Sequence, residues 1–87
     1  MSRAACRIVL DAEGMGLDRV LSALRFRQAE LLSFSVRRSG DAFVAELVAG
    51  ERPGRTMPNL EALFSRIGEV RSVEVQEVEH DEATETA

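Results

Sequence analysis

The chain has 87 residues, of which 45% are hydrophobic and 30% charged, and its formal net charge is −4. This length accommodates one small domain, and no apolar run approaches the ~18–20 residues that span a bilayer. The first residues do not read as a secretory leader, so we expect a cytoplasmic protein that does not act at a membrane.

Acidic residues are concentrated at the end of the chain. Residues 79–87 contain four acids and no base, which leaves residues 1–78 neutral, with 11 acids and 11 arginines. The arginines are scattered, so the charge pattern argues against nucleic-acid binding. The only cysteine, Cys6, excludes an intrachain disulfide and a cysteine-based metal cluster, and its place in a strand predicts a buried core residue.

The first third of the chain has the pattern of a strand followed by a helix. Residues 5–11 form an apolar run that is typical of a central strand. Residues 17–28 then carry apolar side chains at helical spacing. These side chains are Leu17, Val20, Leu21 and Leu24.

The middle of the chain predicts a β-hairpin. Residues 30–38 and 42–49 each alternate apolar and polar side chains, and a Ser-Gly-Asp turn joins them. The alternation indicates that Phe34 and Phe43 face the core. The full set expected on the buried face is Leu32, Phe34, Val36, Phe43, Ala45 and Leu47.

A second helix and a last strand complete the pattern. Residues 50–56 contain two glycines and a proline and are expected to form a loop. The spacing predicts a helix over 57–67, with Thr56 as its N-cap and Gly68 as the residue that ends it. Residues 70–78 are rich in valine and predict the last strand.

This βαββαβ order predicts the α+β ferredoxin-like sandwich. Right-handed crossovers place both helices on one face of a four-stranded antiparallel sheet in the order 4-1-3-2. We expect residues 1–78 to form this domain and residues 79–87 to be a disordered acidic tail. The second strand lies at an edge that is weakly charged from Leu31 to Val36, and such an edge invites pairing. We therefore expect a homodimer, formed through that edge or through the open face of the sheet.

Several kinds of chemistry lack the residues that they need. The only histidine, His80, lies in the predicted tail, which argues against a catalytic or metal-binding imidazole. Asp11 and Glu13 are close but have no evident partner base. A soft-metal chaperone would carry two cysteines in the first loop, and an RNA-binding version would carry stacking aromatics. We expect a protein that is not itself an enzyme and has no metal and no cofactor.

The turn between the first strand and the first helix is the segment best suited to a ligand. A strand that passes through Gly14 and Gly16 into a helix exposes backbone N–H groups at the helix start. Such groups suit a small anion or a carboxylate. The alternative is that both glycines only permit a tight strand-to-helix turn.

The same residues resemble a known family. The segment 8–20, Ile-Val-Leu-Asp-Ala-Glu-Gly-Met-Gly-Leu-Asp-Arg-Val, resembles the opening of an ACT domain. Residues 17–21, followed by Arg-Phe-Arg at 25–27, are similar to the first helix of the short form of the acetolactate synthase small (regulatory) subunit. Residues 63–73 resemble the helix-to-last-strand region of that family, so the likeness covers residues 6–78. The sequence departs from the family in one extra residue between the loop glycine and the helix.

The resemblance implies an effector site and a catalytic partner. It implies a dimer that binds a small amino acid, with the backbone N–H groups of Gly14 to Gly16 holding the carboxylate and Asp11 receiving the ammonium. Met15 and Leu17 would then contact an apolar side chain such as that of valine. The thiamine diphosphate and flavin chemistry of branched-chain amino-acid biosynthesis would belong to a separate catalytic large subunit.

Two other functions stay open beside a regulatory subunit. One is a stand-alone ACT-type ligand sensor, and the other is a structural dimerisation partner that binds no effector. Asp11 separates them, because its loss would leave a structural subunit intact but not a sensor.

Overall fold

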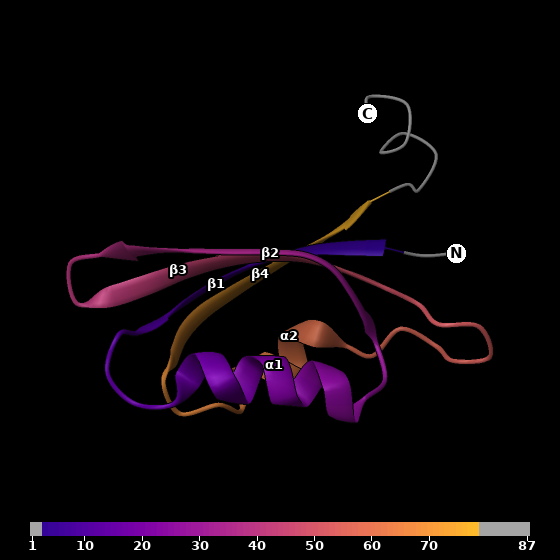
Figure 1. The fold of residues 1–87 in the computed structure, drawn as a ribbon, viewed down its shortest axis with the longest axis horizontal. Coiled ribbons are helices and arrows are strands. Elements are labelled where there is room, and N and C mark those ends of the chain that lie inside the picture. Colours follow the sequence, from indigo (N-terminus) through magenta and orange to yellow (C-terminus); the bar gives the residue numbers. More distant parts are fainter. Residues whose placement is uncertain (1–2, 79–87) are drawn as a thin grey trace.

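The computed structural model describes residues 3–78, which form a sheet covered on one face by two helices (Figure 1). The predicted acidic tail at 79–87 lies outside the described residues. In chain order the elements are β1 (Arg3–Asp11), α1 (Gly16–Phe26), β2 (Glu30–Ser39), β3 (Ala42–Gly50), α2 (Leu60–Ser65) and β4 (Val70–Val78).

The sheet has the predicted topology. Its four strands run in the order β2-β3-β1-β4, and every neighbouring pair is antiparallel. Figure 1 shows α1 and α2 together on one side of this sheet, with the other side uncovered. The ferredoxin-like α+β fold is therefore confirmed, and so is the position of β2 at an edge. None of the helices within residues 3–78 has the length and apolar character that a bilayer crossing requires.

The core lies between the sheet and the helices. Its largest fully buried side chains are Ile8, Leu10, Val20, Leu47 and Phe64. Burial of each such side chain contributes ~1.5–3 kcal/mol, which stabilises the contact between the sheet and the helices.

Two aromatic residues and the cysteine lie where the sequence places them. Phe34 and Phe43 are half-buried and pack against the core. Cys6 is buried at 3% exposure, and burial raises the pKa of its thiol to about 11. The thiol therefore stays protonated near neutral pH and behaves as a small apolar side chain.

The second helix is shorter than predicted, and its cap differs. It spans Leu60–Ser65 rather than 57–67, and the side chain of Asn59 accepts a hydrogen bond from the Ala62 N–H at 3.1 Å. The prediction of Thr56 as N-cap was wrong because Pro58 disfavours helical backbone at the residue before it, which delays the helix start. The prediction for Gly68 was also wrong. The described glycines with left-handed backbone are Gly14, Gly40 and Gly54.

The edge strand contains a bulge that changes which leucine faces the helices. The β2–β3 register shifts between Leu31, opposite Ala49, and Ser33, opposite Val48. Leu31 therefore shares the helix-side face with Phe34, and Leu32 occupies the bulge. The expectation that Leu32 and Val36 are buried was wrong, since they are 41% and 37% exposed. The extra residue reverses the alternation at Leu32. Val36 keeps the predicted face, opposite Ala45, and is exposed because β2 is an edge strand.

Candidate functional site

A hollow of about 210 Å³ lies at the end of β1, against the first turn of α1. Seven residues line it: Asp11, Gly14, Met15, Gly16, Leu17, Asp18 and Phe43. The five residues predicted from the sequence are thus brought together around one space. Asp18 and Phe43 are additions that the sequence reasoning missed. At ~30 Å³ per water molecule the space suits a small solute rather than a large one.

Backbone donors are concentrated at this hollow. Gly14 has a left-handed backbone with φ of 96°, and α1 begins directly after Met15, whose side chain makes no capping hydrogen bond. The first N–H groups of a helix have no intrahelical acceptor. In α1 these include the N–H groups of Gly16, Leu17 and Asp18, and all three residues line the hollow. The helix dipole adds partial positive charge there.

Gly16 has a packing role as well. A Cβ atom on Gly16 would lie 2.6 Å from Leu10 Cδ1 and 2.9 Å from Glu69 Cβ. Both distances are shorter than van der Waals contact, so only glycine lets the start of α1 approach β1 and the α2–β4 connection this closely.

Glu69 lies against the same loop. Its carboxylate Oε2 accepts a hydrogen bond from the Met15 N–H at 3.4 Å, and its backbone oxygen accepts one from the Asp11 N–H at 2.8 Å. The other carboxylate oxygen, Oε1, is buried and has no hydrogen-bond partner among the described residues. Glu69 is not among the residues that line the hollow, but it contacts three that are, Gly14, Met15 and Gly16.

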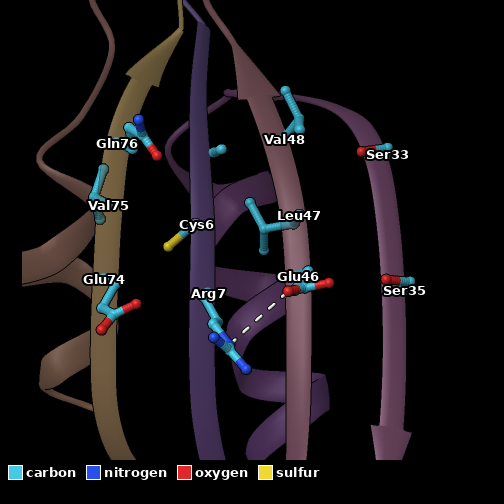
Figure 2. A pocket seen from close by; sticks show the side chains of 11 residues that line it. Cys6, Arg7, Ser33, Ser35, Glu46, Leu47, Val48, Glu74, Val75 and Gln76 are labelled. Carbon is cyan, nitrogen blue, oxygen red and sulfur yellow. Dashed lines mark ion pairs between the residues drawn. The ribbon is translucent and has the colours of Figure 1, made fainter.

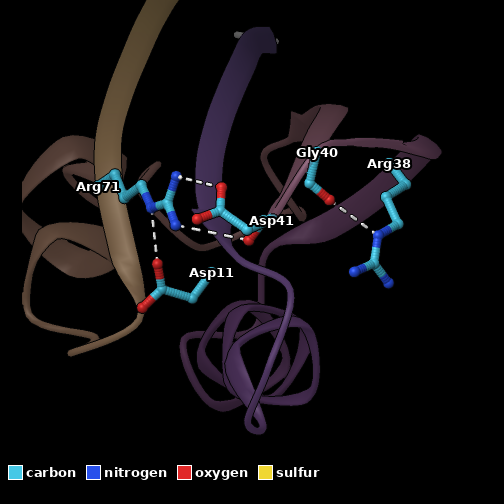
Figure 3. Close-up of polar contacts among 5 residues, drawn as sticks. All are labelled: Asp11, Arg38, Gly40, Asp41 and Arg71. Atoms are coloured by element: carbon cyan, nitrogen blue, oxygen red, sulfur yellow. Dashed lines mark hydrogen bonds and ion pairs between the residues drawn. The ribbon is translucent and has the colours of Figure 1, made fainter.

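Arg71 joins the ends of three strands beside the hollow (Figure 3). Its Nε donates to Asp11 Oδ1 at 2.6 Å, and its Nη1 donates to Asp41 Oδ1 at 3.3 Å. Its Nη2 also donates to the Asp41 backbone oxygen at 3.4 Å. The hydrogen bond and charge of Arg71 lower the pKa of Asp41, and the two carboxylates raise the pKa of Arg71. Because these groups are solvent-exposed, their ion pairs contribute little to stability.

Asp11 is therefore already engaged. One of its oxygens holds Arg71, and the side chain is 47% exposed, so the second oxygen remains accessible to a ligand. The sequence reasoning did not single out Arg71, Asp41 or Glu69. The predicted strand order contained the signal, because it places the start of the last strand beside the end of the first.

The charges around the hollow are mainly acidic. Asp11 and Asp18 line it, and Asp41 and Glu69 lie close by with Arg71 as the paired cation. This balance favours a ligand that carries a positive group and not only a negative one. No group of three potential metal ligands occurs within residues 3–78.

A larger hollow of about 710 Å³ lies over the uncovered face of the sheet (Figure 2). Figure 2 shows polar side chains projecting from all four strands, among them Arg7, Glu46 and Glu74. Arg7 and Glu46 form an exposed ion pair at 3.9 Å. This surface is broad and has no unpaired helix end, so the smaller hollow is the better ligand site.

The sequence matches no family model and no curated protein. Three solved structures resemble the fold. The ACT domain of GTP pyrophosphokinase from Chlorobium tepidum has a TM-score of 0.67 and 13% identity, over 85% of this chain and 96% of that one. The C-terminal domain of the MgtC protein from Mycobacterium tuberculosis has a TM-score of 0.66 and 15% identity, over 92% and 90%.

The third is an uncharacterised protein of Thermotoga maritima, with a TM-score of 0.68 and 17% identity, over 91% of this chain and all of that one. Identities this low establish shared architecture only, and one fold hosts many functions. The chain therefore has the ferredoxin-like fold that these structures share, ACT domains among them.

Proposed function

We propose that this protein is an amino-acid-binding regulatory domain whose effector occupies the hollow at the start of α1. The observation that carries the proposal is the convergence of Asp11, Gly14, Met15, Gly16 and Leu17 on one space beside uncapped helix N–H groups. A small zwitterion matches this arrangement, since it needs donors for its carboxylate and an acceptor for its ammonium.

The orientation of the ligand follows from these groups. The carboxylate would bind the N–H groups of Met15 and Gly16 at the start of α1, where the helix dipole is positive. The ammonium would bind the accessible oxygen of Asp11. Met15 is 56% exposed, and together with Leu17 and Phe43 it offers apolar surface to a side chain such as that of valine. This apolar lining favours branched-chain over charged amino acids.

The proposed catalytic partner is the large subunit of acetolactate synthase, which carries out the chemistry of branched-chain amino-acid biosynthesis. The support is the resemblance of residues 17–21 and 63–73 to the small subunit of that enzyme. Co-purification of the tagged chain from its native host, with mass identification of the bound proteins, tests this partner. Recovery of the chain with no acetolactate synthase large subunit would contradict the proposal.

We also propose a homodimer, formed through the edge strand β2. Leu31 and Val36 are 41% and 37% exposed on this strand, and the strand has a free backbone edge. Light scattering at micromolar concentration should give twice the monomer mass, because association at that level needs only ~8 kcal/mol. Ser33→Lys should weaken the dimer, whereas Ser72→Lys, the same change on the opposite edge strand β4, should not. A monomeric wild type would contradict this proposal.

Ligand titration tests the effector site. Valine, leucine and isoleucine should raise the thermal midpoint, with glutamate and lysine as controls, because ligand at 100 times Kd adds ~2.7 kcal/mol to stability. Asp11→Ala should abolish the response. Asp41→Ala is the matched control, because it removes the other carboxylate of Arg71 but leaves the lining of the hollow unchanged.

A structural dimerisation partner is the second candidate. It is favoured by the intrachain contacts of two proposed ligand groups, since Arg71 already holds Asp11 and Glu69 already accepts from Met15. If no amino acid at millimolar concentration changes stability, with or without the catalytic partner, this candidate replaces the effector site. If amino acids raise the thermal midpoint of the chain alone, and co-purification recovers no catalytic subunit, the protein is instead a stand-alone sensor.

A further inference from the structure

We propose that the carboxylate of Glu69 is a built-in competitor of the effector, which tethers the Gly14–Gly16 loop until a ligand carboxylate replaces it. This inference rests on the proposed effector site and adds its regulation. Glu69 is 54 residues from Met15 in sequence, so the tether connects two distant segments.

The loop is in contact with Glu69 along its whole length. The Met15 N–H donates to Glu69 Oε2, and Cβ atoms on the flanking glycines would lie 3.0 Å and 2.9 Å from atoms of the same side chain. The three residues of this loop also line the hollow, so the Glu69 carboxylate uses a donor, the Met15 N–H, that an effector carboxylate would need.

The tether is weak for a charged group. Its hydrogen bond is 3.4 Å long, beyond the usual range for N–H to carboxylate contacts. Glu69 Oε1 is buried without a partner among residues 3–78, so the tethered state leaves a carboxylate oxygen desolvated and unpaired. Release of Glu69 to water removes that penalty, and a ligand carboxylate that takes over the loop donors makes release favourable.

Release would be transmitted to the start of β4. Glu69 directly precedes β4, and its backbone oxygen is bonded to the Asp11 N–H at the end of β1. Arg71, two residues further, holds the Asp11 side chain that lines the hollow. Effector binding and the position of the α2–β4 connection are therefore linked through the same residues.

Calorimetric titration of the full chain with L-valine, isovalerate and isobutylamine tests this inference. Isovalerate lacks the ammonium of valine, and isobutylamine lacks its carboxylate. Glu69→Ala should bind valine and isovalerate about tenfold more tightly than wild type, which corresponds to an open loop populated at ~10% in the wild type. Isobutylamine affinity should stay unchanged. Glu77→Ala, which removes the same charge at the far end of β4, should bind all three as wild type does.

Amide hydrogen exchange reports on the tether without a ligand. The Met15 amide should exchange faster in Glu69→Ala than in wild type, and Glu77→Ala should leave it unchanged. Equal exchange in both variants would overturn the tether.

If wild type binds valine and Glu69→Ala binds it no more tightly, the competition is overturned but the effector site is not. A loss of valine and isobutylamine binding in Glu69→Ala would instead make Glu69 the ammonium acceptor. Absence of binding to every variant would overturn the effector site itself, and with it the competition.

Discussion

The two strand-to-helix connections of this fold end in different ways. The long connection between β3 and α2, residues 51–59, closes with Asn59, whose own side chain caps the Ala62 N–H. The short connection between β1 and α1, residues 12–15, closes with Met15, which has no capping side chain. The backbone N–H of Met15 instead donates to the carboxylate of Glu69, a residue from the other half of the chain.

The effector site proposed above lies at the helix start that has the remote acceptor. A local cap satisfies the helix permanently, because it folds with the helix. A remote acceptor can be exchanged for another of similar chemistry, because it belongs to a different segment. Two halves with the same βαβ order thus have differently held helix starts, and the following predictions test that difference.

The largest effect is expected at Gly16. Gly16→Ala places a Cβ 2.6 Å from Leu10 Cδ1 and 2.9 Å from Glu69 Cβ, so the start of α1 must shift. We expect a loss of ~1–3 kcal/mol, as for other overpacked sites, measured by urea denaturation. Gly68→Ala is the control, because nothing lies within 4 Å of a Cβ there. Equal stability of the two variants would show that the close approach is unimportant.

The two helix starts should respond differently to loss of the residue that precedes them. Asn59→Ala removes the cap of α2 and should cost ~1 kcal/mol. Met15→Ala removes an exposed side chain that caps nothing, and surface changes of this kind stay within ~0.5 kcal/mol. Thermal unfolding of both variants makes the comparison. A larger loss in Met15→Ala would mean that its side chain stabilises the first turn.

The smallest effect is expected from the Arg71 cluster, and it should depend on pH. Arg71 lowers the pKa of Asp41 from its ordinary value of 3.8, so the unfolded chain takes up this proton at higher pH than the folded chain. The stability that Asp41 contributes is therefore present above pH 3.8 and is lost as the pH falls through the lowered value.

The comparison with Asp41→Asn isolates this group from the other carboxylates. The difference in thermal midpoint between wild type and Asp41→Asn should be constant above about pH 5 and shrink on acidification. A difference that persists unchanged to pH 2 would show that the side chain contributes through packing or its backbone and not through its charge.

The predictions from sequence succeeded where local periodicity decides the outcome. Helical spacing identified the buried face of α1, where Val20 and Leu24 are buried, and strand alternation identified the partners Phe43 and Leu47. The pattern failed at Leu32 because the bulge in β2 is an exception to the two-residue period. It also failed at the start of α2, where Pro58 delays the helix and Asn59 caps it.

The sequence by itself determined the order of the elements and five of the seven residues around the hollow, because these follow from spacing within short segments. The order of the strands in the sheet followed from the handedness of the crossovers. Tertiary structure alone decided what those residues contact. Arg71 reaches Asp11 across 60 positions, and Glu69 reaches Met15 across 54. Those contacts depend on the register between β1 and β4. Register is set by packing of the whole sheet against both helices, so no local pattern contains it.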